Sequence, residues 1–177
     1  MNYCSECGAK VRFQTPAGDD RPRYICNACN RIHYENPKMV VGCIPEYEDK
    51  IIMCRRDIEP RKGKWTLPAG YLENGESVKE GARRETLEES GAVVGNLTSY
   101  LLIDIVYINQ IYLMFRGQMF KPEYYPTAES AEVKLMHESE IPWDQIAFKA
   151  IEKTLQYYFK DRANGNFPFR VRPIEKK

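Results

Sequence analysis

Residues 70–91 read GYLENGESVKEGARRETLEESG, and this stretch decides how the rest of the chain is interpreted. Ser77 and Glu80 have the spacing of a capping box, and Gly91 is well placed to end a helix. We therefore expect a single helix that begins at Ser77 and ends near Gly91, with a glycine-containing loop in front of it.

Three carboxylates gather on this expected helix. Glu85, Glu88 and Glu89 are three and four positions apart, so they occupy one sector about 100° wide. Carboxylates this close repel each other, and a divalent cation bound among them relieves the repulsion; oxygen ligands suit Mg²⁺. Arg84 can hold one carboxylate in place or pair with a phosphate. The alternative is an ordinary solvated helix face laced with salt bridges.

Two Cys-x-x-Cys pairs lie in the first thirty residues, a polar segment with few large apolar side chains. Two such turns can present four thiolates to one tetrahedral Zn²⁺ ion, whose binding replaces the missing core. A redox site and reactive surface thiols are the alternatives, but the strand-to-helix setting of a redox motif is missing. The predicted zinc ligands are Cys4, Cys7, Cys26 and Cys29. His33 lies nearby and is expected to be structural.

The bulk composition indicates a globular protein that acts on a small ligand. The chain has 177 residues and a formal net charge of +1, which gives little general attraction to nucleic acid. No long apolar run and no secretory signal are visible, so we expect a cytoplasmic protein. Neither nucleic acid nor a membrane is an expected partner, and the anionic ligand must bind at a local site.

The remaining pattern alternates strands and helices. Further strands are expected at residues 39–44, 51–54, 100–108, 111–120 and 132–136. Apolar residues at helical spacing predict a last helix over residues 143–159. Residues 163–177 are basic and irregular, and we expect a loosely held tail there. The order of elements favours an α/β fold with a mixed sheet.

The stretch quoted first resembles the Nudix box. All glycine, arginine and glutamate positions that the box names are present, namely Gly70, Glu76, Arg84, Glu85, Glu88, Glu89 and Gly91. Thr86 and Ala92 stand where the pattern has larger aliphatic residues. Residues 1–37 are similar to the zinc-ribbon start of the Nudix branch that includes NADH pyrophosphatases. The expected organisation is a zinc ribbon at 1–35, a Nudix domain at 36–162 and the tail at 163–177.

The resemblance implies a Nudix α/β/α sandwich that hydrolyses a diphosphate bridge with Mg²⁺ or Mn²⁺. By matching position, the metal ligands are Glu85, Glu88 and Glu89 with the backbone carbonyl of Ala69 or Gly70. Arg84 is expected to orient Glu85, and Glu76 to hold the loop against the helix. The general base stays open among Glu85, Glu129 and Glu132.

Residues 36–43, 65–73 and 140–143 also look similar to the plant FAD and ADP-ribose pyrophosphatases. The substrate that this resemblance implies is ADP-ribose or FAD, with release of AMP. NADH ranks second, because the Ser-Gln-Pro-Trp segment of NADH-specific relatives is missing. Arg55 and Arg56 can reach a phosphate, and Tyr107 and Tyr112 can stack on a base; strand-end charges and core aromatics are the alternatives. A zinc-ribbon regulator that senses a nucleotide without cutting it is the competing class. The relatives also imply a homodimer.

Overall fold

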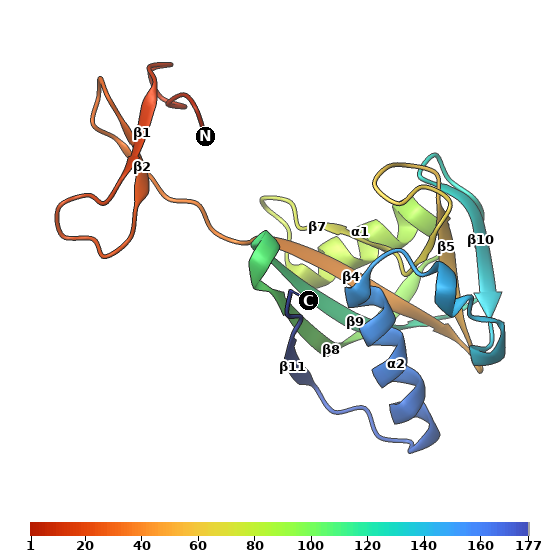
Figure 1. The fold of residues 1–177 in the computed structure, drawn as a ribbon. Helices are drawn as coiled ribbons and strands as arrows, with labels where there is room; N and C mark the ends of the chain where they lie inside the picture. The colour runs from red at the N-terminus through yellow and green to blue at the C-terminus, as the bar shows by residue number, and fades with distance from the viewer. Residues whose placement is uncertain (177) are drawn as a thin grey trace. The chain divides into compact units, whose positions relative to one another are not determined.

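The computed structural model describes residues 1–176. The chain divides into two compact units, one from Met1 to Pro37 and the other beginning at Lys38 (Figure 1). This division lies close to the boundary at residues 35 and 36 that the sequence indicates. Each unit has its own sheet.

The small unit is an antiparallel sheet with almost no core. Its strands are β1 (Val11–Gln14), β2 (Arg23–Cys26) and β3 (Ile32–His33), in that order. The apolar side chains buried here are Cys4, Ile25 and Cys26, while Phe13 is 62% exposed. Burial of so little apolar surface does not offset the entropy of ordering some thirty-five residues. The unit therefore needs another source of stability.

The large unit is a mixed sheet with one helix on each face. The sheet order is β10-β5-β4-β9-β8-β11, and two short strands, β6 and β7, pair with β5 and β4. The β4–β9 and β8–β11 pairs are parallel and the others antiparallel. The strands are β4 (Lys38–Tyr47), β5 (Lys50–Arg56), β6 (Trp65–Thr66), β7 (Ala69–Tyr71), β8 (Val94–Ile105), β9 (Gln110–Met119), β10 (Ser130–Met136) and β11 (Arg170–Pro173).

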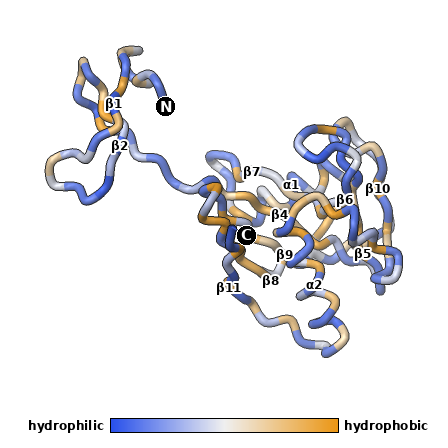
Figure 2. The backbone as a smooth tube through the Cα atoms, in the orientation of Figure 1, coloured by the Kyte–Doolittle hydropathy of each residue, from blue (hydrophilic) through white to orange (hydrophobic). Residues whose placement is uncertain are grey.

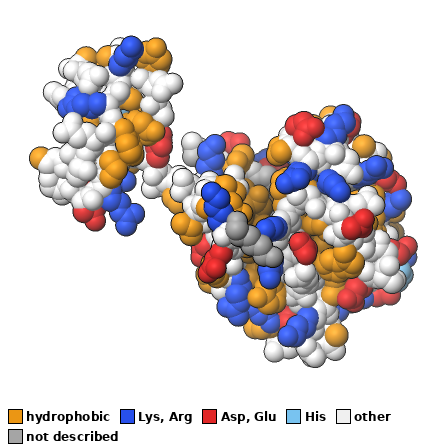
Figure 3. All heavy atoms as spheres, in the orientation of Figure 1, with side chains coloured by type: hydrophobic (Ala, Val, Ile, Leu, Met, Phe, Trp, Pro, Cys, Tyr) orange, Lys and Arg blue, Asp and Glu red, His pale blue; other side chains and the backbone are white. Residues whose placement is uncertain are grey.

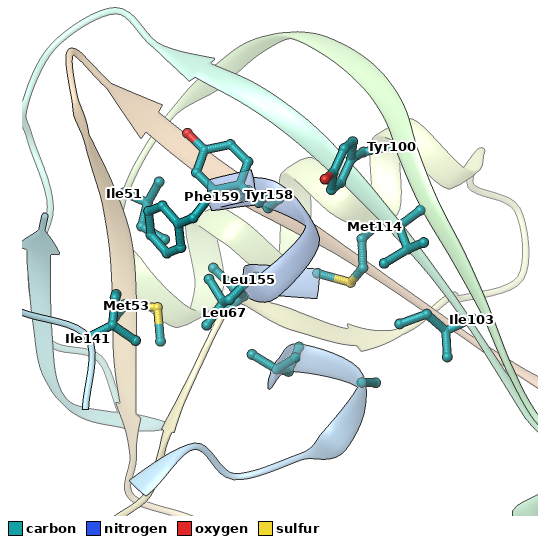
Figure 4. Close-up of a cluster of buried hydrophobic side chains, with 14 of the residues drawn as sticks. Ile51, Met53, Leu67, Tyr100, Ile103, Met114, Ile141, Leu155, Tyr158 and Phe159 are labelled. Atoms are coloured by element: carbon teal, nitrogen blue, oxygen red, sulfur yellow. The ribbon is translucent and has the colours of Figure 1, made fainter. Parts of the chain in front are cut away.

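Alternating side chains of the strands feed two separate cores. On β5, Ile51 and Met53 belong to one core, whereas Ile52 and Cys54 belong to the other. Helix α2 (Lys149–Ala163) covers the first core, shown in Figure 4, and α1 (Val78–Ser90) covers the second. Hydrophobic stretches follow the strands of the large sheet in Figure 2. The predicted α/β/α sandwich is confirmed.

Helix α1 begins and ends where the sequence predicts. Ser77 caps its amino end: the hydroxyl accepts from Glu80 N at 3.3 Å, and the Glu80 carboxylate accepts from Ser77 N at 2.8 Å. Gly91 ends the helix with φ of 69°, a left-handed conformation that glycine adopts without strain.

The surface carries charges of both signs. Acidic and basic side chains are interspersed over the face that Figure 3 shows, in keeping with a net charge of +1. Neither α1 nor α2, the α-helices of residues 1–176, has the length and apolar composition to cross a bilayer.

The last helix begins later than predicted. Residues Trp143–Gln145 form a separate 3-10 turn, and α2 starts only at Lys149. The residues between them are extended because Ile146 bridges to Trp65 and the Ala147 amide donates to the Trp65 carbonyl at 2.8 Å. A pairing with a residue eighty positions earlier thus overrides the local helical pattern.

The prediction of a loosely held tail is wrong. Arg170–Pro173 form β11, which pairs in parallel with Leu101–Asp104 of β8. Arg170 also makes a bidentate ion pair with Asp161 of α2, and Asp161 accepts a 2.7 Å hydrogen bond from the Tyr100 hydroxyl. These contacts fasten residues 170–173 to both the sheet and the helix.

Asp161→Asn is expected to destabilise the protein by about 2–4 kcal/mol at pH 7, because it leaves Arg170 without its carboxylate. Burial alone would raise the pKa of Asp161, but hydrogen bonds from Arg170 and Tyr100 outweigh burial and lower it. The carboxylate therefore stabilises the fold above its unfolded pKa of about 3.9, and this contribution is lost as the pH falls through the lower folded pKa.

Urea unfolding of wild type and variant at pH 7 and pH 3 checks this. The difference in unfolding free energy should shrink at the lower pH, and Asp144→Asn on the exposed surface should show little change at either. An equal difference at both pH values would contradict the assignment.

Candidate functional site

The loop before α1 and the helix itself meet at Gly70. Strand β7 pairs with β4, with Gly70 opposite Val41, and its other side faces α1. A Cβ atom placed on Gly70 would lie 2.3 Å from both carboxylate oxygens of Glu85. Only glycine leaves room for that carboxylate, so the backbone of β7 forms one wall of the site.

Arg84 joins three acidic residues. Its Nη1 donates to Glu85 at 2.7 Å and to Glu88 at 2.9 Å, and its Nε and Nη2 bind Glu76 at 3.0 and 2.7 Å. Glu76 also accepts the amide hydrogen of Glu73 at 2.8 Å. The predicted orientation of Glu85 by Arg84 matches these contacts, as does the predicted anchoring of the loop by Glu76.

Glu89 and Glu85 are buried acids. The Glu89 carboxylate accepts a 2.9 Å hydrogen bond from the Ala69 amide, yet burial outweighs that bond and raises the pKa of Glu89 to about 8. Burial likewise raises the pKa of Glu85, against the opposing effect of Arg84. Two buried carboxylates on adjacent turns make a site that favours added positive charge.

The carboxylates of the three predicted metal ligands lie along one side of α1, but their oxygen atoms do not all come close to one another. Within residues 1–176, only the four N-terminal cysteines form a group of three or more potential ligand residues with all ligand atoms within 4.8 Å of one another. Arg84 lies between Glu85 and Glu88, and Glu89 is turned to the Ala69 amide. The donors are all oxygen, Glu85 and Glu89 are buried, and Gly70 leaves space beside them. These residues fit a hard divalent cation such as Mg²⁺ or Mn²⁺.

Glu132 and Arg55 lie apart from this cluster. Glu132 pairs with Arg55 at 3.6 Å and with Lys134, which lowers the pKa of its carboxyl, Lys134 being the larger cause. Arg55 also donates to the Gly63 carbonyl at 3.1 Å. Glu129, in contrast, is close enough for its charge to act on both Glu85 and Glu89. Of the two later-loop acids, Glu129 is the one whose charge acts on the carboxylates of α1.

A cavity of about 470 Å³ opens beside the same loop. Arg56 and Tyr112, both predicted to contact substrate, line it together with Ala69 and Gly70, whereas Arg55 is not part of its lining. Several further lining residues were not predicted from the sequence, among them Arg61, Phe148 and Lys149. No short motif marks them, because they come from a loop and a helix end that meet only in the folded chain.

The four N-terminal cysteines converge as predicted. Their Sγ–Sγ separations include 3.4 Å for Cys7–Cys26, 3.7 Å for Cys7–Cys29 and 3.8 Å for Cys4–Cys29. Tetrahedral Zn–S bonds of about 2.3 Å place sulfur atoms about 3.8 Å apart. Each pair is followed by a left-handed residue, Gly8 or Asn30, that closes its turn.

The surroundings favour a thiolate at Cys26, whereas hydrogen bonds with neighbouring thiols outweigh those from the backbone and raise the pKa of Cys7 and of Cys29. Backbone amides of Cys29 and Ala28 point at Cys26 Sγ, at 3.4 and 3.3 Å, and lower the pKa of Cys26 to about 6. His33 is buried, with Nε2 at 3.3 Å from Cys4 Sγ. The site therefore suits a bound cation, and His33 contacts a ligand from outside the set of four sulfurs.

Family models match both units. The model described as "Nudix N-terminal" matches residues 2–35, and the model described as "NUDIX domain" matches residues 36–158. A crystal structure of a NUDIX hydrolase from Nitrosomonas europaea is 46% identical, with a TM-score of 0.95, and the match covers 99% of this chain and all of that one.

Curated relatives carry two kinds of activity in their names. "NAD-capped RNA hydrolase NudC" of Vibrio cholerae is 24% identical over 170 residues, or 92% of this chain and 61% of that protein. "ADP-ribose pyrophosphatase" of Methanocaldococcus jannaschii is 40% identical over 60 residues, or 34% of this chain and 36% of that one. The chain spans 22–36% of the length of the first three curated relatives it matches.

Proposed function

Because the chain belongs to the Nudix hydrolase family, we propose that it is a pyrophosphatase that depends on a divalent metal and cuts the diphosphate bond of a nucleoside diphosphate derivative. ADP-ribose and FAD are the leading substrates, with AMP as the common product. The observation that carries the proposal is the packing of Glu85 and Glu89 against Ala69 and Gly70, beside a cavity that holds Arg56 and Tyr112.

The acidic residues of α1 are proposed to hold Mg²⁺ or Mn²⁺ together with a backbone carbonyl of Ala69 or Gly70. Such a cation neutralises phosphate charge and makes water a better nucleophile. Arg84 fixes the Glu85 side chain through a 2.7 Å hydrogen bond, so this carboxylate is pre-positioned. Glu85 is the proposed acceptor of the proton of the attacking water, with Glu129 as the alternative.

Gly70→Ala is expected to lower kcat by about 10- to 100-fold with little change in KM. The new Cβ would overlap the Glu85 carboxylate, which must then leave its place beside β7. The clash meets the far end of a side chain, so the loss of stability should be modest, about 1–2 kcal/mol. Steady-state kinetics and thermal unfolding check both statements. A variant with kcat within twofold of wild type would contradict the role given to this contact.

The experiment that tests the proposed function is product identification on a panel of substrates. Purified protein with Mg²⁺ is incubated with ADP-ribose, FAD, NADH, coenzyme A, dinucleoside polyphosphates and NAD-capped RNA. The last is included because relatives named for that activity align along most of the chain. Mass spectrometry should detect AMP most rapidly from ADP-ribose or FAD.

Other outcomes redirect the proposal. If AMP is released fastest from NADH or from NAD-capped RNA, that compound replaces ADP-ribose and FAD as the proposed substrate. No turnover of any member with Mg²⁺ or Mn²⁺ would favour a nucleotide sensor. The cytoplasmic location and the homodimer stay predictions, and gel filtration with light scattering tests the latter.

A further inference from the structure

The four sulfur atoms of the cysteine cluster lie in two kinds of surroundings. Cys4 and Cys26 are buried, whereas Cys7 and Cys29 are exposed. Four thiolates carry more negative charge than one Zn²⁺ neutralises, so each bound sulfur still attracts hydrogen-bond donors. Water supplies such donors to an exposed sulfur. A buried sulfur depends on donors from the protein, because an uncompensated charge is costly away from water.

Each buried sulfur has two N–H groups of the chain beside it. Cys26 Sγ faces the backbone amides of Ala28 and of the residue that follows it, at 3.3 and 3.4 Å. Cys4 Sγ faces the backbone amide of Glu6 at 3.4 Å and Nε2 of His33 at 3.3 Å. At Cys4, the imidazole of His33 thus takes the place that a second backbone amide takes at Cys26.

The sheet of the small unit carries His33 to this position. His33 ends β3 and lies opposite Tyr24 of β2, with the two strands antiparallel. Its side chain is 8% exposed, so it is packed within a unit that buries few apolar residues. The contact joins segments that are 29 residues apart in the sequence. It therefore links the first cysteine pair to the last strand of the sheet.

His33 lies beside the set of metal ligands and is not a member of it. In the described part of the chain, the group whose ligand atoms all lie within 4.8 Å of one another contains the four cysteines without His33. A zinc-bound thiolate has no proton to donate, so the hydrogen between the two side chains is on Nε2 of the imidazole. His33 donates, and the sulfur of Cys4 accepts.

We propose that His33 is a positioning residue of the zinc site, whose Nε2–H donates a hydrogen bond to the Cys4 thiolate and keeps that sulfur on the ion. Contacts of this kind orient metal ligands and tune the bound ion. A sulfur that already accepts hydrogen bonds is less readily protonated, and so it leaves the ion less readily. The proposal concerns the small unit alone and does not depend on the substrate of the large one.

Replacement of zinc by Co²⁺ tests the hydrogen bond directly, because thiolate-to-Co²⁺ charge-transfer bands depend on the electron density at sulfur. Carboxylate ligands give no such bands. In the full chain, His33→Phe removes the donor and should move the bands to lower energy. His33→Gln keeps an N–H donor and should restore most of the difference. His137→Phe makes the same substitution at the other histidine, which pairs with Asp49 in the large unit, and is the matched control.

Zinc release to a chromogenic chelator measures the consequence for the metal. His33→Phe should release zinc about 10- to 100-fold faster than wild type. His33→Gln should stay within about threefold of wild type, and His137→Phe within about twofold. His33→Met, which is close to glutamine in size but has no N–H, separates the hydrogen bond from packing. It also repeats the comparison if His33→Phe does not fold.

Three results would overturn the inference. The first is a band position and release rate that are equal in wild type, His33→Phe and His33→Met. The second is equal release from His33→Gln and His33→Met, since packing alone would then explain the effect. The third is a wild-type spectrum with the intensity of three sulfur ligands that Cys4→Ser leaves unchanged, because His33 would then be a ligand itself. A wild type without zinc would overturn the zinc site and the inference together.

Discussion

Glu85→Gln is expected to lower kcat by about 10²- to 10⁴-fold. Glutamine keeps the size of the side chain and can still meet Arg84, but it has no charge for a cation and cannot accept a proton. The carboxylate that is lost is buried beside Gly70 and held by a 2.7 Å hydrogen bond from Arg84. Steady-state hydrolysis of the fastest substrate at saturating Mg²⁺ measures the effect.

Glu80→Gln is the matched control, since it makes the same substitution on the same helix. Glu80 is exposed, and glutamine can still complete the capping box with Ser77. Its kcat should stay within about twofold of wild type. Equal activity of Glu85→Gln and Glu80→Gln would remove Glu85 from the reaction.

Cys26→Ser is expected to unfold the small unit altogether. Structural zinc sites contribute about 10–16 kcal/mol of apparent binding free energy, and residues 1–37 bury too little apolar surface to fold without it. Wild type should contain one zinc per chain, and the variant much less. In ¹H–¹⁵N spectra of the full chain, amides of residues 1–37 should collapse to unfolded positions while those of residues 38–176 stay dispersed.

Cys54→Ala is the control, because it removes a cysteine that lies outside the proposed zinc site. Cys54 is fully buried in β5, far in sequence from the cysteine pairs, and its loss should leave the zinc content at one per chain. A small unit that keeps dispersed amides after complete removal of metal by a chelator would contradict a zinc-dependent fold.

Local signals in the sequence were sufficient for α1 and for the five longest strands, β4, β5, β8, β9 and β10. The capping box at Ser77 and the stop at Gly91 depend on neighbouring residues only, and the structure reproduces both. Likewise, the alternation along β5 directs Ile51 and Ile52 to opposite faces of the sheet, as a half-turn per residue requires.

The predicted and observed elements differ where segments that are distant in the sequence pair with each other. The start of α2 was predicted too early because Ala147 bonds to Trp65, and β11 was missed because its partner, β8, lies some seventy residues earlier. Four residues with exposed Val171 and Arg172 give no strand signal of their own. Such pairings are set by tertiary contacts, which a window of sequence does not contain.

The residues of the site also fall into two groups: those that short sequence patterns reveal and those that only the fold brings together. Glu85, Glu88 and Glu89 could be found because one helix carries them, and the two cysteine pairs because their spacing is short. Arg55 and Arg56 look alike in the sequence, and only the fold sends the second into the cavity. Glu129 and Glu132 could not be ranked as candidate bases from the sequence, because no motif records the course of the chain that carries them.

Metal-dependent hydrolysis is tested by measuring AMP release from ADP-ribose by mass spectrometry, in Mg²⁺ and in excess EDTA, for wild type and Glu88→Gln. If the family fold carries out metal-dependent diphosphate hydrolysis, wild type with Mg²⁺ releases AMP and ribose 5-phosphate in equal amounts. EDTA should abolish the release, and Glu88→Gln should reduce it strongly. AMP release that is equal in EDTA, or unchanged in Glu88→Gln, would rule out hydrolysis by a metal held on the carboxylates of α1.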